Sequence, residues 1–143
     1  MLSFVSRSWR AAGACALLAG SSVLAACGGG NNFAPPVGAT PIPVTEVFED
    51  TLSRNGAKTY PFAAQAGGTV TATLASIEPA AAVGLSLGTW NGQACQIIIA
   101  NDRAVTGTIV VGTASAIGNL CVRVYDIGEV TGTVLFRISV FHP

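Results

Sequence analysis

Apolar side chains recur at every second position through most of residues 44–143, and this period of two limits the possible fold more than any other feature. In an extended strand, successive side chains point to opposite faces, so each such segment presents one apolar row to a core. The clearest segments are Thr69–Leu74, Val83–Leu87, Leu120–Tyr125 and Val134–Val140.

Two further runs, Cys95–Ile99 and Thr108–Val111, are continuously apolar and predict more fully buried strands. Shorter strands are expected over Val44–Phe48 and Lys58–Phe62, which brings the total to about eight. Turn signals such as Asn91-Gly92 separate them. Two packed sheets are the common way to bury many one-sided strands, so we expect a single all-β domain over residues 44–143, folded as a β-sandwich.

Charged residues make up only 10% of the sequence, well below the roughly 25% of an average soluble domain. Acidic and basic residues balance at 7 each, and no basic stripe is present. Arg7 and Arg10 fall in a segment that we expect to be removed, which leaves the mature chain slightly acidic. This composition excludes a disordered chain and gives no reason to expect a nucleic-acid partner.

Residues 1–26 have the organisation of a secretory signal peptide. Arg7 and Arg10 precede the apolar stretch Ala11–Ala26, which as a helix would span about 24 Å, short of the roughly 30 Å hydrocarbon core. The stretch ends in Leu24-Ala25-Ala26-Cys27, which resembles the bacterial lipobox. The alternative is an ordinary signal peptide followed by a chance cysteine.

The lipobox resemblance implies that the chain is cut before Cys27 and that acyl chains on its sulfur anchor an exported protein to membrane lipid. Gly28 stands where an aspartate often retains such proteins at the inner membrane, so outer-membrane placement is favoured. Residues 27–43 are rich in glycine and proline and predict a flexible tether between lipid and domain.

Of the four cysteines, Cys15 lies in the signal peptide and Cys27 is the expected acylation site, which leaves Cys95 and Cys121. An exported chain meets an oxidising compartment, so we expect these two to form a disulfide. It would close a loop of about 26 residues, worth roughly 3.5 kcal/mol on the chain-entropy model. Strict alternation puts the two cysteines on different faces, so a β-bulge or a strand-end position is required.

The segment Gly118–Gly128, followed by Val134–Pro143, resembles the closing strands of the bacterial pre-peptidase C-terminal domain, in which a Val-x-Val-Tyr strand and a glycine turn precede the last strand. Three upstream segments also follow the order of the corresponding segments in that family, namely Lys58–Phe62, Gly67–Val70 and Leu85–Leu87. The resemblance implies a jelly-roll-like sandwich that assists secretion or binds matrix proteins or polysaccharides. Leu120 stands where that family commonly has an aromatic residue.

Some relatives in that family bind calcium through acids near the start of the domain, which makes Glu46, Glu49 and Asp50 candidate ligands. The alternative, favoured because the D-x-D-G spacing is missing, is that the two glutamates face solvent on an edge strand and Asp50 begins a turn. No other cofactor is expected. His142, the only histidine, is one residue from the C-terminus, where we expect fraying rather than catalysis.

Trp90 and Asn91 form the other candidate site, because a tryptophan at a turn would stack on a sugar ring or on a partner's aliphatic patch. A role in capping the strand before it is the favoured alternative. We therefore expect a lipid-anchored, non-enzymatic interaction or structural module of the cell envelope. Two alternatives stay open: a module that binds carbohydrate or matrix protein, and an accessory subunit that inhibits or chaperones a secreted hydrolase.

Acylation at Cys27 is directly testable. We expect mass spectrometry of the membrane-extracted protein to find Cys27 as the first residue, carrying the added mass of its acyl chains. Cys27→Ser should abolish the acyl modification, because the sulfur that would carry the acyl chains is gone. An unmodified Cys27 in purified membranes would contradict the anchor.

Overall fold

The computed structural model describes residues 40–143. The predicted signal peptide, Cys27 and most of the predicted tether lie outside the described residues. Within residues 40–143, no helix is long and apolar enough to cross a membrane. This part of the chain forms eight strands: β1 (Val44–Leu52), β2 (Ala57–Ala64), β3 (Gly68–Glu78), β4 (Val83–Trp90), β5 (Cys95–Ala104), β6 (Ile109–Ala114), β7 (Gly118–Tyr125) and β8 (Val134–His142).

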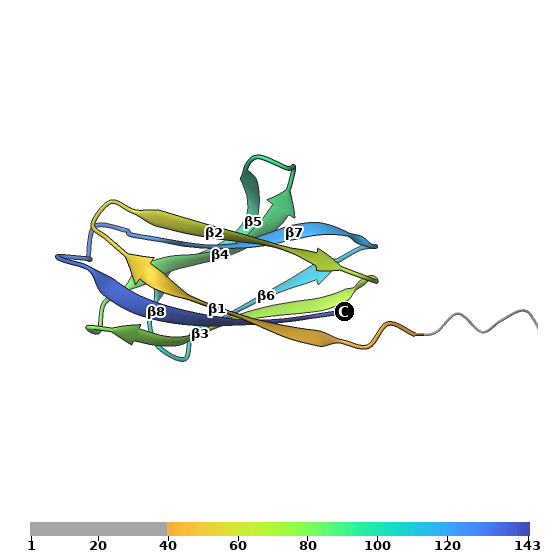
Figure 1. The fold of residues 1–143 in the computed structure, drawn as a ribbon, viewed down its shortest axis with the longest axis horizontal. Helices are drawn as coiled ribbons and strands as arrows, with labels where there is room; N and C mark the ends of the chain where they lie inside the picture. Colours follow the sequence, from red (N-terminus) through yellow and green to blue (C-terminus); the bar gives the residue numbers. More distant parts are fainter. Residues whose placement is uncertain (1–39) are drawn as a thin grey trace, which may run out of the picture. The chain divides into compact units, whose positions relative to one another are not determined.

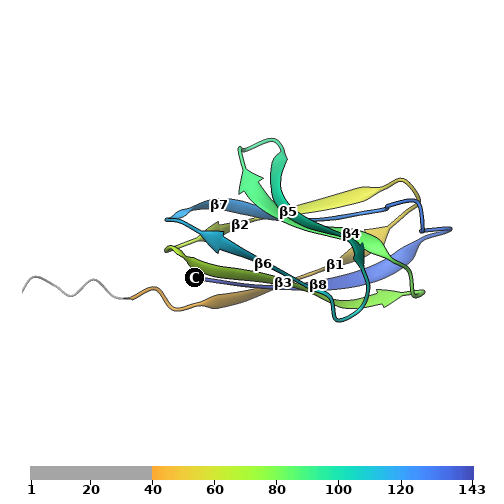
Figure 2. The same cartoon turned by 180° about the vertical axis from the view of Figure 1, so that it is seen from behind.

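The strands form two antiparallel four-stranded sheets, which Figures 1 and 2 show from opposite sides as two stacked layers. The first sheet has the order β1-β8-β3-β6, and the second sheet has the order β2-β7-β4-β5. Successive strands cross between the sheets everywhere except at the β4–β5 hairpin, which is the order of an eight-stranded jelly roll. The predicted all-β, jelly-roll-like sandwich is confirmed.

Strand β8 shows how the alternating sequence builds the core. Its even-numbered residues point between the sheets, and Phe136, Ile138 and Val140 are completely buried, while Leu135 and Phe141 face solvent. The second sheet adds its own inward rows to the same cluster, including Leu85, Val122 and Val124. Burying each of these side chains contributes about 1.5–3 kcal/mol, which makes the space between the sheets the main source of stability.

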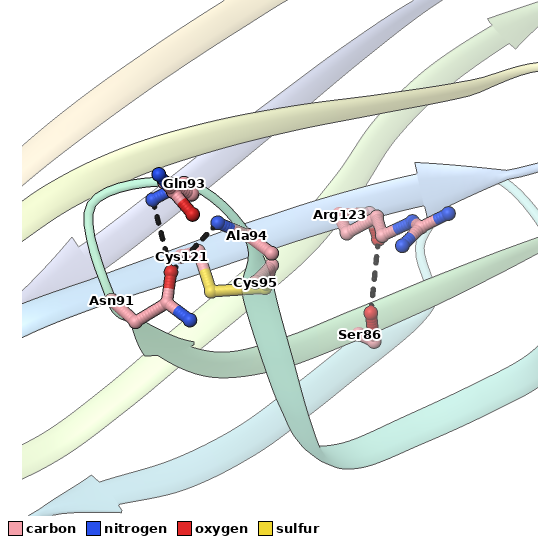
Figure 3. Close-up of a disulfide and its surroundings, with 7 residues drawn as sticks. All are labelled: Ser86, Asn91, Gln93, Ala94, Cys95, Cys121 and Arg123. Carbon is pink, nitrogen blue, oxygen red and sulfur yellow. Dashed lines mark hydrogen bonds between the residues drawn. A yellow bond between two sulfur atoms is a disulfide. The ribbon is translucent and has the colours of Figure 1, made fainter.

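Strand β4 differs from its prediction, because all but its last two residues are buried and not only the alternate apolar ones. On the outward face, the ring of Tyr125 lies directly over Gly84. The hydroxyl of Ser86 is also buried and donates a hydrogen bond to the carbonyl oxygen of Arg123 at 3.4 Å, which Figure 3 shows. The small outward residues of β4 therefore lie beneath neighbouring strands instead of facing solvent.

The prediction of fully buried strands for the two continuous apolar runs is wrong. β5 and β6 are edge strands, one in each sheet, and nothing in the described part of the chain pairs with their outer edges. Only Val110 and Ala114 of β6 are buried. The exposed apolar residues of the two strands are Ile97 (46%), Ile98 (73%), Ile99 (41%), Ile109 (56%) and Val111 (51%).

Cys95 and Cys121 form the predicted disulfide, with Cα atoms 5.8 Å apart (Figure 3). They lie on β5 and β7, which flank β4 and would be about 9.5 Å apart in a flat sheet. The β4–β5 register shifts between Leu87 and Gly88, which turns Cys95 toward the face that carries Cys121. Both solutions that the sequence allowed are therefore present, since a β-bulge interrupts the β4–β5 pairing and Cys95 is the first residue of β5, and the hairpin bends over β4 to close the bridge.

Gly88 permits this bend. The backbone of β5 crosses so closely over β4 that a Cβ at residue 88 would overlap the carbonyl group of Gln96. Figures 1 and 2 show the result, with the tip of the β4–β5 hairpin rising away from the plane of the second sheet.

Gly88→Ala should destabilise the domain by about 1–3 kcal/mol, because the added methyl group meets backbone that cannot move without opening the bend. Gly112→Ala is the matched control, since a Cβ there finds Leu87 Cδ1 at an ordinary 3.5 Å. Urea unfolding of both variants with the disulfide intact measures the difference. Equal midpoints for the two variants would contradict the proposed crowding at Gly88.

Candidate functional site

A groove of about 570 Å³ opens on the second sheet beside the tip of the β4–β5 hairpin. This volume lies within the roughly 300–1,000 Å³ range of small-molecule sites. Strands β2 and β7 form its floor and the hairpin forms its wall. The groove, called the Trp90 groove below, is lined by Pro61, Phe62, Ala63, Trp90, Asn91, Gly92 and Asn119.

Trp90 is the last residue of β4 and is half-buried. It pairs across the hairpin with Cys95, and the disulfide joins Cys95 to Cys121 on β7. The indole is therefore held on a wall that is covalently tied to the strand beneath it. Both roles considered for Trp90 fit this position, because the side chain ends its strand and also lines the groove.

Asn91 shapes the turn that follows Trp90. Its Oδ1 atom accepts hydrogen bonds from the backbone N–H groups of Gln93 at 2.9 Å and Ala94 at 2.8 Å, as Figure 3 shows. Gly92 takes a φ of 95°, a left-handed conformation that favours glycine. The side-chain oxygen of Asn91 is thus committed to the turn, and its NH₂ group is the part left to contact a ligand.

The residues that line the Trp90 groove are all uncharged. The indole of Trp90, the ring of Pro61 and the methyl group of Ala63 supply apolar surface, whereas the amides of Asn91 and Asn119 supply hydrogen-bonding groups. A few placed polar groups on an apolar surface suit a neutral ligand that is itself apolar on one face and hydroxylated at its edges. A pyranose ring has this character.

The floor of the groove was not predicted. Pro61, Ala63 and Asn119 lie far from Trp90 in the sequence, and their outward faces meet it only because β2, β7 and β4 are neighbours in the second sheet. Strand order is a tertiary property, so period-two patterning identifies such faces without saying which of them adjoin.

The three carboxylates considered for calcium are not brought together. Each lies against a different residue: Glu49 forms an ion pair with Arg137 at 3.1 Å and Asp50 forms one with Lys58 at 2.8 Å, whereas Glu46 Oε1 lies 3.0 Å from His142 Nε2. Asp50 lies inside β1 instead of beginning a turn. No group of three metal-ligating side chains occurs among the described residues. Calcium binding stays a prediction without a geometric argument.

His142 does not occupy a frayed end. It is the last residue of β8 and is only 3% exposed, with its ring 4.9 Å from that of Phe62. Its Nε2 atom lies 3.0 Å from Glu46 Oε1, and its Nδ1 atom lies 3.3 Å from the carbonyl oxygen of Pro143. Backbone pairing with β1 carries the strand to its end, which is why the expectation of fraying is wrong.

Asp50 joins the two sheets at the edge formed by β1 and β2. Hydrogen bonds from Lys58, from the backbone N–H of Thr51 and from the Tyr60 hydroxyl lower the pKa of the Asp50 carboxyl to about 2. Burial, together with the hydrogen bond to Asp50, raises the pKa of Tyr60 above its usual value. A charged carboxylate and a neutral phenol are therefore the forms that hold this edge together.

No family model and no curated protein matches the sequence. The resemblance to the pre-peptidase C-terminal domain stays a prediction, and the functional argument depends on the residues and geometry described above.

Because the pKa of Asp50 is lowered in the folded protein, the free energy of unfolding should depend on pH in the acidic range. The group is more acidic in the folded state, so its contribution is complete above about pH 4 and is lost as the pH falls toward 2. Asp50→Asn should lower the melting temperature at pH 7 and lose less stability than wild type between pH 4 and 2. Thermal unfolding across this range measures both effects.

Glu78→Gln, which removes an exposed carboxylate at the end of β3, is the control. It should leave the acid dependence close to that of wild type. Part of that dependence remains in Asp50→Asn, because backbone N–H groups, that of Asn55 foremost, also lower the pKa of Asp126. Parallel pH curves for wild type and Asp50→Asn would contradict the role of Asp50.

Proposed function

We propose that this chain is a lipid-anchored, non-catalytic binding module of the bacterial cell envelope that holds a neutral carbohydrate in the Trp90 groove. The observation that carries the proposal is the groove itself, which is lined by an indole, by other uncharged residues and by the side-chain amides of Asn91 and Asn119. Sugar rings combine an apolar face with peripheral hydroxyl groups, so an aromatic platform beside amides complements both parts.

The fixed wall of the groove favours binding. Trp90 is held by strand pairing and by the neighbouring disulfide, and Asn91 is held by its own turn. A site that is already ordered loses little conformational entropy when a ligand arrives. An accessible, rigid aromatic side chain is also the type of residue that contributes most at binding surfaces.

Export and anchoring in the proposal depend on the lipobox-like sequence at Cys27, with the outer membrane as the favoured location. The disulfide fits an exported protein, because such bonds persist in oxidising compartments. The proposed absence of catalysis is supported by the single histidine, both of whose ring nitrogens have partners in the structure. A histidine that acts as general base must have a ring nitrogen within hydrogen-bond reach of the reacting proton, and the His142 side chain is only 3% exposed.

Carbohydrate binding is tested with the detergent-extracted full chain on an array of bacterial and plant glycans, followed by titration of the best neutral oligosaccharide. Trp90→Ala should weaken binding by about tenfold or more, as expected when an aromatic anchor is removed. Trp90→Phe keeps a smaller ring at the same position and should retain part of the affinity.

Phe141→Ala is the matched control, because it removes an aromatic side chain that is 45% exposed on the first sheet, away from the groove. Its affinity should equal that of wild type. Each variant is checked for the Cys95–Cys121 disulfide, so that a loss of binding reports on the indole and not on an open hairpin. Undiminished binding by Trp90→Ala would rule out the groove as the carbohydrate site.

A further inference from the structure

The chain enters the sandwich from residue 40 at one of its two ends, which we call the tether end. β1 begins there beside the end of β8, since Val44 pairs with His142. The β2–β3 turn lies at the same end, because the N–H of Gln65 donates a hydrogen bond to the carbonyl oxygen of Pro143 at 2.8 Å. The β6–β7 turn lies there too, as Figures 1 and 2 show. The tether end comprises residues 40–45, 64–69, 113–118 and 139–143.

Charged residues are unevenly divided between the two ends of the sandwich. The tether end has no aspartate, glutamate, lysine or arginine, and its one histidine, His142, is buried. The strand ends and turns at the opposite end include Arg54, Glu78, Asp126 and Glu129. The side chains of the tether end therefore neither attract nor repel an anionic surface.

The two most exposed large apolar side chains among residues 40–143 both belong to the tether end: Ile42 is 84% exposed and Ile117 is 75% exposed. Ile42 precedes β1 and Ile117 follows β6, and these strands are the two edges of the first sheet. Three strand spacings separate the two edges, which is about 14 Å. Two apolar side chains placed so far apart suit a flat apolar partner, because a single pocket would cover only one of them.

We propose that the tether end lies on the surface of the bilayer that holds the acyl chains of Cys27, with Ile42 and Ile117 inserted at the boundary between headgroups and acyl chains. This inference rests on the anchoring at Cys27 that is part of the proposed function. The chain between Cys27 and Thr40 is about 13 residues long and spans at most about 45 Å when fully extended. The tether end is therefore the part of the domain that the anchor brings to the membrane.

A small apolar contact is sufficient for an anchored domain. Two isoleucines would not hold a free protein on a membrane, but the anchor makes the contact intramolecular and so raises the effective concentration of lipid. The contact needs no charge attraction and should persist at high salt. The Trp90 groove opens on the second sheet and not at the tether end, so a carbohydrate can bind while the domain contacts the bilayer.

Fluorescence quenching by brominated lipid tests this orientation. The acylated protein is reconstituted into protein-free vesicles of phosphatidylethanolamine and phosphatidylglycerol, part of which carries bromine on the acyl chains. Trp90→Phe removes the only tryptophan of the predicted mature chain, and Ile117→Trp then places a single emitter at the tether end. Brominated lipid should quench this emission, and high salt should leave the quenching unchanged.

Leu135→Trp in the same Trp90→Phe background is the matched control. Leu135 is 57% exposed and pairs with Thr51 at the other end of β8, so its replacement should not be quenched. Equal quenching at both positions would place the first sheet flat on the bilayer. An unquenched Ile117→Trp would leave the turn in water. Either result would overturn the proposal.

Hydrogen exchange gives a second measurement that needs no added tryptophan. The amides of residues 115–117 should exchange more slowly in acylated wild type on vesicles than in the double variant Ile42→Asp/Ile117→Asp, because carboxylates oppose insertion into lipid. Neither side chain belongs to the core, so the double variant should fold. Leu135→Asp should behave as wild type does. Equal exchange in wild type and the double variant would overturn the proposal.

Intact mass of the reconstituted protein separates this inference from the anchor on which it rests. An unmodified Cys27 would overturn the anchor and the orientation together. An acylated chain whose Ile117→Trp emission is unquenched would overturn the orientation alone. Carbohydrate binding is measured separately through Trp90→Ala, so its failure would not alter the quenching result.

Discussion

The burial of one apolar row from every strand between two sheets is the interaction on which the rest of this structure depends. Phe136, Ile138 and Val140 of β8 meet the inward rows of β4 and β7, and no other part of the described chain offers a comparable apolar volume. Because the sequence has few charged residues, ion pairs contribute at particular places and not throughout. The sandwich core therefore holds the strands, and the edges carry the remaining chemistry.

Strand β4 connects the core to the candidate site. Its inward residues belong to the core, while its small outward residues let Tyr125 and the bent hairpin pack closely above them. Gly88 allows β5 to cross, the crossing brings Cys95 to Cys121, and the disulfide holds Trp90 in place. The wall of the Trp90 groove is thus shaped by three features of one hairpin: the absent side chain at Gly88, the register shift beside it and the disulfide.

The two sides of the sandwich where the sheet edges meet, β1 beside β2 and β5 beside β6, differ in charge. Asp50, Lys58 and Tyr60 form a polar bridge between β1 and β2, and their hydrogen bonds shift the pKa values of both Asp50 and Tyr60. On the opposite side, β5 and β6 expose β-branched side chains, and a small apolar crevice of about 50 Å³ opens there. An ion pair and a hydrogen bond therefore link the strands on one side of the sandwich, whereas exposed apolar side chains line the other.

The sequence alone determined the eight strands, the sandwich and the cysteine pair, because alternation is a local property and only two cysteines remained for a disulfide. The alternation of side chains also showed that a β-bulge or a strand-end position was needed to bring the two cysteines to one face. The sequence did not predict that Cys95–Ile99 lies at a sheet edge, that Ser86 is buried or that His142 lies beside Glu46. It also did not predict that Asn119 and Trp90 line the same groove. Those outcomes depend on which strands become neighbours, and that choice is made by long-range packing between sheets, which no local pattern records.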